Sequence, residues 1–249
     1  MFVDMCKQVV KENIDFLPPY EVTGASMYIR PTLIGSNPQL GVQSSKEATF
    51  LMLCAPVGAY VGGALDAVDV VIARNYDRAA PNGSGSFKVG GNYACSLYSL
   101  NVAHKLGYKA VLYLDPRTRE HVDEFNSSNF FGIKGNTYVT PESPSILPSI
   151  TNKSLETVAR HLGMEVERRP VHVSELADFE EVGECGTAVV ITPVSHLDDK
   201  PFLESEEVTR YTYIEDGCGP KSQKLYDFIT GIQYAEIDDP FGWNVEVEL

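Results

Sequence analysis

Stretches with the composition of strands alternate with stretches of helical periodicity along this chain of 249 residues, and that alternation constrains the fold more than any other feature. Strands are predicted at 26–33, 48–55, 67–73, 110–114, 164–168 and 187–194. Helices are predicted at 3–16, 93–106, 151–162 and 222–232. A hairpin is predicted from 129–133 and 137–140, which flank a turn containing Gly135. Strands and helices interleaved in this way predict an α/β (α+β) fold.

Two of the predicted helices carry a clear apolar stripe. In 93–106 the stripe consists of Leu97, Leu100, Ala103 and Leu106. In 151–162 it consists of Leu155, Val158, Ala159 and Leu162. Residues three or four positions apart share one face of a helix, so both stripes are expected to face the core.

A cluster of glycines suggests where the chain divides into domains. Gly58, Gly62 and Gly63 surround Tyr60, a composition typical of a linker. The predicted division is a small domain at 1–57, an interdomain linker at 58–66 and a large domain at 67–249.

The balance of charges limits the possible partners. Lys plus Arg number 20 and Asp plus Glu number 34, which gives a net charge of −14. A surface this acidic repels phosphate backbones, so no nucleic-acid partner is expected. The apolar runs are too short to span a membrane, and the first residues lack the basic and apolar regions of a signal peptide. We therefore expect a cytoplasmic protein without a membrane partner.

The cysteines and histidines show no metal-binding pattern. The 5 cysteines have no C-x-x-C spacing, and the 5 histidines have no H-x-x-x-H spacing. The odd number of cysteines indicates reduced thiols rather than a disulfide framework. No metal site is expected.

Lys88 is a candidate catalytic residue. It lies in the glycine-rich stretch GSGSFKVGGNY, residues 83–93. A Walker phosphate loop is excluded, because Val89 stands where such a loop has Ser or Thr. A lysine that forms a Schiff base with an aldehyde is one interpretation, since glycines on both sides let a flat cofactor approach the backbone. An exposed loop lysine is the other, and spacing alone favours it.

Tyr93 and Glu124 could serve the same cofactor. Tyr93 begins the helix that follows Lys88, and its phenol could donate to a cofactor oxygen or simply cap the core. Glu124 follows a predicted strand and turn. If buried, its carboxylate could pair with a protonated ring nitrogen, whereas an exposed one would be an ordinary turn carboxylate.

Two segments could bind anions through backbone amides. Ile150 and Thr151 begin a predicted helix, and the first amides of a helix lack intrahelical partners. Capping of this helix by Ser149 or Thr151 is the alternative, and both can hold at once. Thr187 and Ala188 follow a glycine turn and offer two amides and a hydroxyl, unless the turn is an ordinary one.

Tyr28 and Arg30 are two positions apart and therefore share one face of a predicted strand. The planar guanidinium of arginine is suited to carboxylate recognition. A surface pair without a ligand is the alternative.

Five sequence blocks occur in an order that identifies a family. They are YIRPTLIGSNPQLGV (28–42), PVGAY (56–60), KVGGNY (88–93), SILPSITNKSL (145–155) and GTAVVITPV (186–194). With these blocks the chain resembles the branched-chain amino acid aminotransferases, which are pyridoxal-phosphate enzymes of fold type IV. The resemblance runs from about Met1 to the C-terminus.

The resemblance implies a fold, a cofactor and a reaction. The fold is that of the D-amino acid aminotransferase-like enzymes, here an incomplete small domain plus a complete large domain that binds pyridoxal 5′-phosphate. The implied reaction is a reversible ping-pong transfer of the amino group of L-leucine, L-isoleucine or L-valine to 2-oxoglutarate, giving glutamate and branched 2-oxo acids. A homodimer and a part in branched-chain amino acid biosynthesis are implied as well.

The resemblance also assigns roles to residues. Lys88 matches the lysine that holds the cofactor covalently and shuttles the proton between the substrate Cα and the cofactor. The other implied cofactor-binding residues are Tyr93 at the phenolic oxygen, Glu124 at the pyridine nitrogen, and Ile150, Thr151 and Thr187 at the phosphate. The implied substrate-binding residues are Tyr28, Arg30, Tyr60, Thr187 and Ala188.

The chain departs from the family pattern at three places. Asn126 and Ser149 stand where the family usually has glycine. Family members begin with a further segment that completes the small domain and gives an arginine to the cofactor phosphate, and this chain starts after it. Two alternatives therefore remain open: another fold-type-IV enzyme, such as a D-amino acid aminotransferase or an aminodeoxychorismate lyase, or a catalytically impaired truncated fragment.

Overall fold

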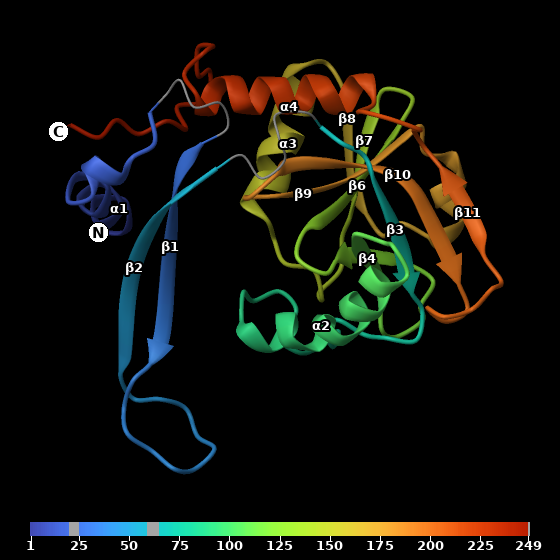
Figure 1. The fold of residues 1–249 in the computed structure, drawn as a ribbon, viewed down its shortest axis with the longest axis horizontal. Helices are drawn as coiled ribbons and strands as arrows, with labels where there is room; N and C mark the ends of the chain where they lie inside the picture. Colours follow the sequence, from blue (N-terminus) through green and yellow to red (C-terminus); the bar gives the residue numbers. More distant parts are fainter. Residues whose placement is uncertain (20–24, 59–64, 249) are drawn as a thin grey trace. The chain divides into compact units, whose positions relative to one another are not determined.

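The structure is a computed structural model that describes residues 1–19, 25–58 and 65–248. The chain forms two compact units (Figure 1). One consists of residues 1–63 together with 241–249, and the other of residues 64–240. Each unit is described by itself.

The first unit is built on a long hairpin. Strands β1 (Ser26–Gly35) and β2 (Ala48–Val57) pair antiparallel over their whole length, from Ser26 opposite Val57 to Gly35 opposite Ala48. Helix α1 (Phe2–Lys11) packs on β2, with the rings of Phe2 and Phe50 6.3 Å apart, and a short 3-10 helix covers Ile14–Phe16. None of the residues of β1 and β2 is buried.

The second unit contains a nine-stranded sheet. Its strands are β3 (Val68–Ala73), β4 (Ala110–Leu114), β5 (Val122–Phe125), β6 (Asn129–Lys134), β7 (Thr137–Pro141), β8 (Glu165–Arg169), β9 (Glu181–Gly186), β10 (Val190–Lys200) and β11 (Thr209–Thr212). The main order is β11-β10-β3-β4-β5-β6-β7-β8. Because β9 pairs with both β10 and β6, the strands β10, β3, β4, β5, β6 and β9 close into a ring without free edges.

Helices cover this sheet on two sides (Figure 1). Helix α2 (Gly90–Lys105) packs on β4, whereas α3 (Ile150–His161) and α4 (Pro220–Gln233) pack on each other and on β9. A 3-10 helix covers Val173–Asp178. The main core cluster includes Val70, Leu112, Phe125 and Phe130, which come from four strands of the ring. The predicted α/β fold class is confirmed.

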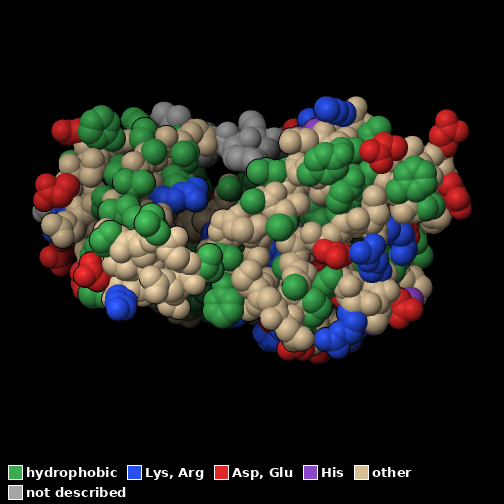
Figure 2. All heavy atoms as spheres, turned by 90° about the horizontal axis from the view of Figure 1, so that it is seen from below, with side chains coloured by type: hydrophobic (Ala, Val, Ile, Leu, Met, Phe, Trp, Pro, Cys, Tyr) green, Lys and Arg blue, Asp and Glu red, His purple; other side chains and the backbone are tan. Residues whose placement is uncertain are grey.

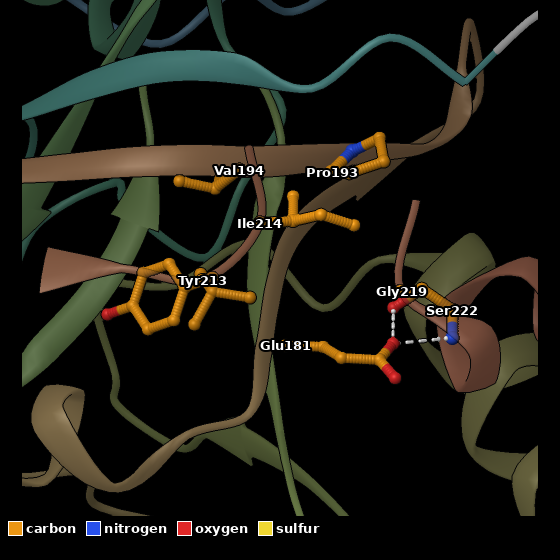
Figure 3. A pocket seen from close by; sticks show the side chains of 8 residues that line it. Glu181, Pro193, Val194, Tyr213, Ile214, Gly219 and Ser222 are labelled. Atoms are coloured by element: carbon orange, nitrogen blue, oxygen red, sulfur yellow. Dashed lines mark hydrogen bonds between the residues drawn. The ribbon is translucent and has the colours of Figure 1, made fainter. Parts of the chain in front are cut away.

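A buried carboxylate from the sheet holds the start of α4. Glu181 on β9 accepts hydrogen bonds from the amides of Lys221 and Ser222 at 3.0 and 2.8 Å, and from the Ser222 hydroxyl at 2.6 Å. Figure 3 shows Glu181 pointing at Ser222 beside a small pocket. A Cβ on Gly219 would lie 2.5 Å from Glu181 Cγ and closer still to its carboxylate, so any larger residue there would displace the Glu181 side chain. Glu181 therefore replaces a local N-cap.

The apolar stripe predicted for α2 is wrong in part. Leu97 is 54% exposed and Leu106 is 43% exposed, while Ala103 is buried. The buried face instead carries small and polar residues, namely Asn92, Ser96, Ser99 and Ala103. Small side chains allow α2 to approach β4 closely, where the Ser99 and Tyr113 hydroxyls hydrogen-bond at 2.5 Å. Apolar side chains are accordingly visible on the surface seen from the α2 side (Figure 2).

Some elements were not expected from the sequence. Strands β5, β9 and β11 were missed, and β10 runs on to Lys200. Glu124 was placed after a turn but lies within β5, and Thr187 was placed in a strand but lies in the turn between β9 and β10. Within the described residues, no helix has both the length and the apolar character needed to cross a membrane.

Candidate functional site

Lys88 and Tyr93 lie side by side at the start of α2. Lys88 precedes the helix, and Tyr93 is in its first turns. The Lys88 ammonium donates a hydrogen bond of 2.7 Å to the Tyr93 hydroxyl and lies 4.8 Å from the centre of the phenol ring. Lys88 is exposed and Tyr93 half-buried, so a ligand can reach both groups. An amine and a phenol are thus presented together by one short segment.

Asn92 anchors the loop that carries Lys88. Its side chain is 5% exposed. The amide nitrogen donates to the carbonyl oxygens of Ser84 and Phe87 at 2.6 and 2.9 Å, and the amide oxygen accepts from the Ser84 hydroxyl at 2.8 Å. The residue directly before Lys88 is therefore bonded to the first turn of the helix that follows it. Sequence reasoning gave Asn92 no role.

The same loop packs against the segment that leads into α3. A Cβ placed on the buried Gly85 would lie only 2.7 Å from the Ser145 Cα and closer still to its carbonyl oxygen. No side chain larger than hydrogen fits there without moving the backbone. Gly85 thus permits a close approach between the Lys88 loop and residues 143–147.

Glu124 is buried in β5, at 4% exposure. One carboxylate oxygen, Oε1, accepts from the Leu147 amide at 3.0 Å, and the other, Oε2, accepts from the Asn129 side-chain amide at 3.0 Å. Burial raises the pKa of Glu124 to about 7, although the positive charges of Arg78 and Lys88 and the Leu147 amide act in the opposite direction. The alternative of a solvated turn carboxylate is excluded.

Arg78 pairs with Glu124 and was missed in the sequence. Its side chain is 6% exposed, and its Nη2 lies 2.5 Å from Glu124 Oε1. The same nitrogen donates to the Ser145 carbonyl at 2.5 Å and, at 3.5 Å, to the Gly85 carbonyl. No local pattern marks this arginine, because its partners come from three separate segments.

A second buried carboxylate neighbours Glu124. Asp123 is 4% exposed, and its Oδ2 accepts from the Ser145 hydroxyl at 2.5 Å. Among the described residues, its Oδ1 has no hydrogen-bond partner. Burial raises the pKa of Asp123 despite the hydrogen bonds from Ser145 and Ser143.

The start of α3 offers amides to an anion. Ser149 is the N-cap, and its hydroxyl accepts from the Asn152 amide at 3.2 Å. The amides of Ile150 and Thr151, the first two residues of the helix, have no intrahelical acceptor, and the helix dipole favours negative charge beside them. Capping and anion binding are thus compatible here. Ser149 in place of glycine supplies the cap.

The segment before α3 is also tied to Glu124. Asn129 bridges the Glu124 carboxylate and the Leu147 carbonyl, each at 3.0 Å. Asn126, the other departure from the family pattern, bonds to the backbone of β4: its side-chain oxygen accepts from the Val111 amide at 3.1 Å. Thr187 and Ala188 are exposed in the β9–β10 turn, where an anion can reach their amides.

The remaining predicted residues lie outside the second unit. Tyr28 and Arg30 share a face of β1, and the Arg30 guanidinium lies 4.9 Å from the centre of the Tyr28 ring. Tyr60 lies outside the described residues. The substrate-binding role of these three residues stays a prediction.

Comparison with known proteins relates this arrangement to one family. Residues 3–197 match the family described as amino-transferase class IV. A branched-chain-amino-acid aminotransferase of Haemophilus influenzae is 45% identical over 255 residues, which cover 100% of this chain and 72% of the relative.

Two solved structures have a similar fold. The branched-chain amino acid aminotransferase of Escherichia coli matches with a TM-score of 0.78 and 28% identity, covering 99% of this chain and 76% of that one. A second branched-chain amino acid aminotransferase, solved with pyridoxamine 5′-phosphate, matches with a TM-score of 0.79 and 26% identity, covering 97% of this chain and 73% of that one.

Proposed function

The chain belongs to the class IV amino-transferases, and from this premise we propose that it is a pyridoxal-phosphate-dependent branched-chain aminotransferase. It transfers the amino group of L-leucine, L-isoleucine or L-valine reversibly to 2-oxoglutarate. The observation that carries this function is the contact between the Lys88 amine and the Tyr93 phenol, on a loop whose Gly85 carbonyl lies 3.5 Å from Arg78, the ion-pair partner of the buried Glu124. The relatives with similar sequences and folds are named for the same reaction.

The residues of the second unit fit pyridoxal 5′-phosphate. When bound, this cofactor supplies an electron-withdrawing ring that stabilises negative charge at the substrate α-carbon. Glu124 Oε2 accepts one hydrogen bond, from Asn129, and so has a lone pair left for a ring N–H. Arg78 contacts the other carboxylate oxygen, Oε1, so a positive ring nitrogen would approach Glu124 at Oε2.

Lys88 supplies the amine that holds the cofactor covalently and moves a proton at the substrate α-carbon. Its hydrogen bond to Tyr93 keeps the ammonium beside the phenol, which would donate to the cofactor's phenolic oxygen. The Asn92 hydrogen bonds fix the loop before Lys88, so the amine starts from a defined position.

Backbone amides provide the sites for the anionic groups. The amides of Ile150 and Thr151 and the hydroxyl of Thr187 would bind the cofactor phosphate, which the N-terminus of α3 favours electrostatically. The amides of Thr187 and Ala188 would receive the substrate α-carboxylate. Their exposure in the β9–β10 turn supports this role.

Tyr28, Arg30 and Tyr60 would form the substrate side-chain pocket, with Arg30 recognising the side-chain carboxylate of glutamate. Support for these roles comes from the sequence blocks 28–42 and 56–60. The division into a small domain at 1–57, a linker at 58–66 and a large domain at 67–249 belongs to the same proposal. So do a homodimer and a cytoplasmic location.

The test is a comparison of the wild type with Lys88→Ala and Lys88→Arg. With added pyridoxal 5′-phosphate, the wild type should show the visible absorbance of a lysine-bound cofactor and form glutamate from L-leucine and 2-oxoglutarate. Both variants should lose both signals. Without cofactor, they should unfold at a urea concentration similar to that of the wild type, because Lys88 is exposed. Turnover of D-alanine in place of L-leucine would instead indicate another reaction of this fold type.

A further inference from the structure

The proposed reaction assigns no role to Arg78, although its side chain is buried. It is a buried cation beside a loop rich in Gly, Ser, Asn and Pro, and the adjacent Asp77 pairs with Arg119 instead. A buried charge is stable only when it is paired and hydrogen-bonded. The contacts that pair and hydrogen-bond Arg78 therefore indicate what this residue does.

The first partner is the carboxylate at the centre of the site. Both side chains of the Arg78–Glu124 pair are nearly inaccessible, at 6% and 5% exposure, with 2.5 Å between Nη2 and Oε1. Removal of one member of a buried pair leaves the other charge uncompensated. The charge of Glu124 thus depends on Arg78.

The other partners are main-chain carbonyls on two segments. Ser145 O lies 2.5 Å from Arg78 Nη2, two residues before Leu147, whose amide donates to Glu124. Gly85 O lies 3.5 Å away, three residues before Lys88. One guanidinium therefore contacts the carboxylate, the loop that carries the reactive amine and the segment that leads to α3. All three contacts are made by the one nitrogen Nη2.

We infer that Arg78 is a positioning residue for transamination: its charge favours the ionised form of Glu124, and its contacts fix that carboxylate relative to the loop that carries Lys88. This role rests on the proposed function, because an ionised Glu124 is what would keep a bound ring nitrogen protonated. The contacts of Arg78 are with Glu124, Gly85 and Ser145, so it would act through them.

The charged groups that face Glu124 shift its pKa in both directions. Arg78 and Lys88 lower the pKa of Glu124, whereas Asp123 on the same strand raises it. Cys185 on β9 is within electrostatic range, since Glu124 contributes to the raised pKa of that thiol. Asn129 and the Leu147 amide add hydrogen bonds without charge. Arg78 is the strongest influence opposing burial, so its loss should leave Glu124 largely protonated at neutral pH.

The experiment titrates Glu124 directly in the protein without cofactor. Side-chain carboxyl ¹³C NMR of labelled glutamate would follow the resonance that Glu124→Gln removes. Wild type, Arg78→Lys and Arg78→Met are compared, with Arg210→Met as a control that breaks the unrelated pair with Asp198. A rise of one unit above 7 in Arg78→Met would leave about a tenth of Glu124 ionised at pH 7. Arg78→Lys and Arg210→Met should titrate near the wild type.

Kinetics then separates positioning from simple structural support. The acid limb of the kcat profile for leucine should move to higher pH in Arg78→Met, whereas Arg78→Lys should lower kcat at all pH values with little change in KM. Unchanged Glu124 titration in folded Arg78→Met overturns the inference. If Arg78→Met does not fold, wild-type kcat and cofactor affinity in Arg78→Lys overturn it instead. A wild type that titrates as expected but does not transaminate leucine would refute the proposed function and leave the Arg78–Glu124 coupling standing.

Discussion

The side-chain amide of Asn92 donates a 2.9 Å hydrogen bond to the carbonyl oxygen of Phe87, the residue immediately before Lys88. The backbone directly before Lys88 is therefore held by the first turn of the helix that follows it, although the Lys88 side chain is exposed. An exposed side chain can adopt many rotamers. The fold therefore fixes the backbone near Lys88 rather than the position of its side chain.

Asn92→Ala should loosen this loop. The carbonyls of Ser84 and Phe87 would lose their donor, at a cost of about 1–3 kcal/mol in the free energy of unfolding. We expect weaker cofactor binding as well, measured by absorbance titration alongside urea unfolding. Asn136→Ala, which removes an exposed hydrogen bond to Gly163, is the matched control and should alter stability less and cofactor affinity not at all. Equal cofactor affinity in wild type and Asn92→Ala would contradict the anchoring role.

Gly85→Ala should destabilise the second unit. The added Cβ would lie 2.7 Å from the Ser145 Cα, and backbone cannot rotate away as a long side chain can. Overpacking of this kind costs about 1–3 kcal/mol. Gly90→Ala provides the control, because nothing lies within 4 Å of its Cβ and alanine is the better helix former. Thermal unfolding should show a lower Tm for Gly85→Ala alone; similar values for both variants would refute the close approach.

Stability in the absence of cofactor should depend on the ionisation of Glu124. Its pKa is raised by burial to about 7 from an ordinary value of 4.5, so the folded state binds this proton more tightly than the unfolded chain. The corresponding stability is complete below about pH 4.5 and is lost as the pH rises through 7. Urea unfolding across this window should show a decline in the wild type that is smaller in Glu124→Gln. The exposed Glu142→Gln is the control, and parallel curves for wild type and Glu124→Gln would count against the shifted pKa.

Arg30→Ala should weaken the binding of glutamate and 2-oxoglutarate but not the binding of leucine. If the guanidinium binds the side-chain carboxylate of glutamate, its loss removes a charge-assisted hydrogen bond worth about 1.5–3 kcal/mol. The KM for glutamate and 2-oxoglutarate should then rise by about tenfold or more, while the KM for leucine changes little. Steady-state kinetics with each substrate measures this, with the exposed Arg117→Ala as control. A similar rise in the KM for leucine would contradict a role of Arg30 at the side-chain carboxylate of glutamate.

Local sequence patterns were sufficient to predict a helix that has its own apolar stripe and its own capping residue. The helix expected at 151–162 is α3, with Leu155, Val158 and Ala159 buried and Ser149 as its cap. Periodicity failed for α2, because its buried face is chosen by hydrogen bonds to neighbouring segments rather than by apolarity. Leu97 and Leu106 of the predicted stripe are exposed, whereas Leu100 and Ala103 belong to the packed side.

The sequence by itself determined the α/β class, the family, and the placing of Lys88 and Tyr93 on one short segment, because these depend on residues close together in the chain. Only the tertiary structure decided that Glu124 is buried in a strand and that Arg78 neutralises it. Those facts depend on sheet pairing and on contacts between segments far apart in the chain, from 78 to 124 and to 145. Burial and charge pairing arise from packing between distant segments, which no local pattern encodes.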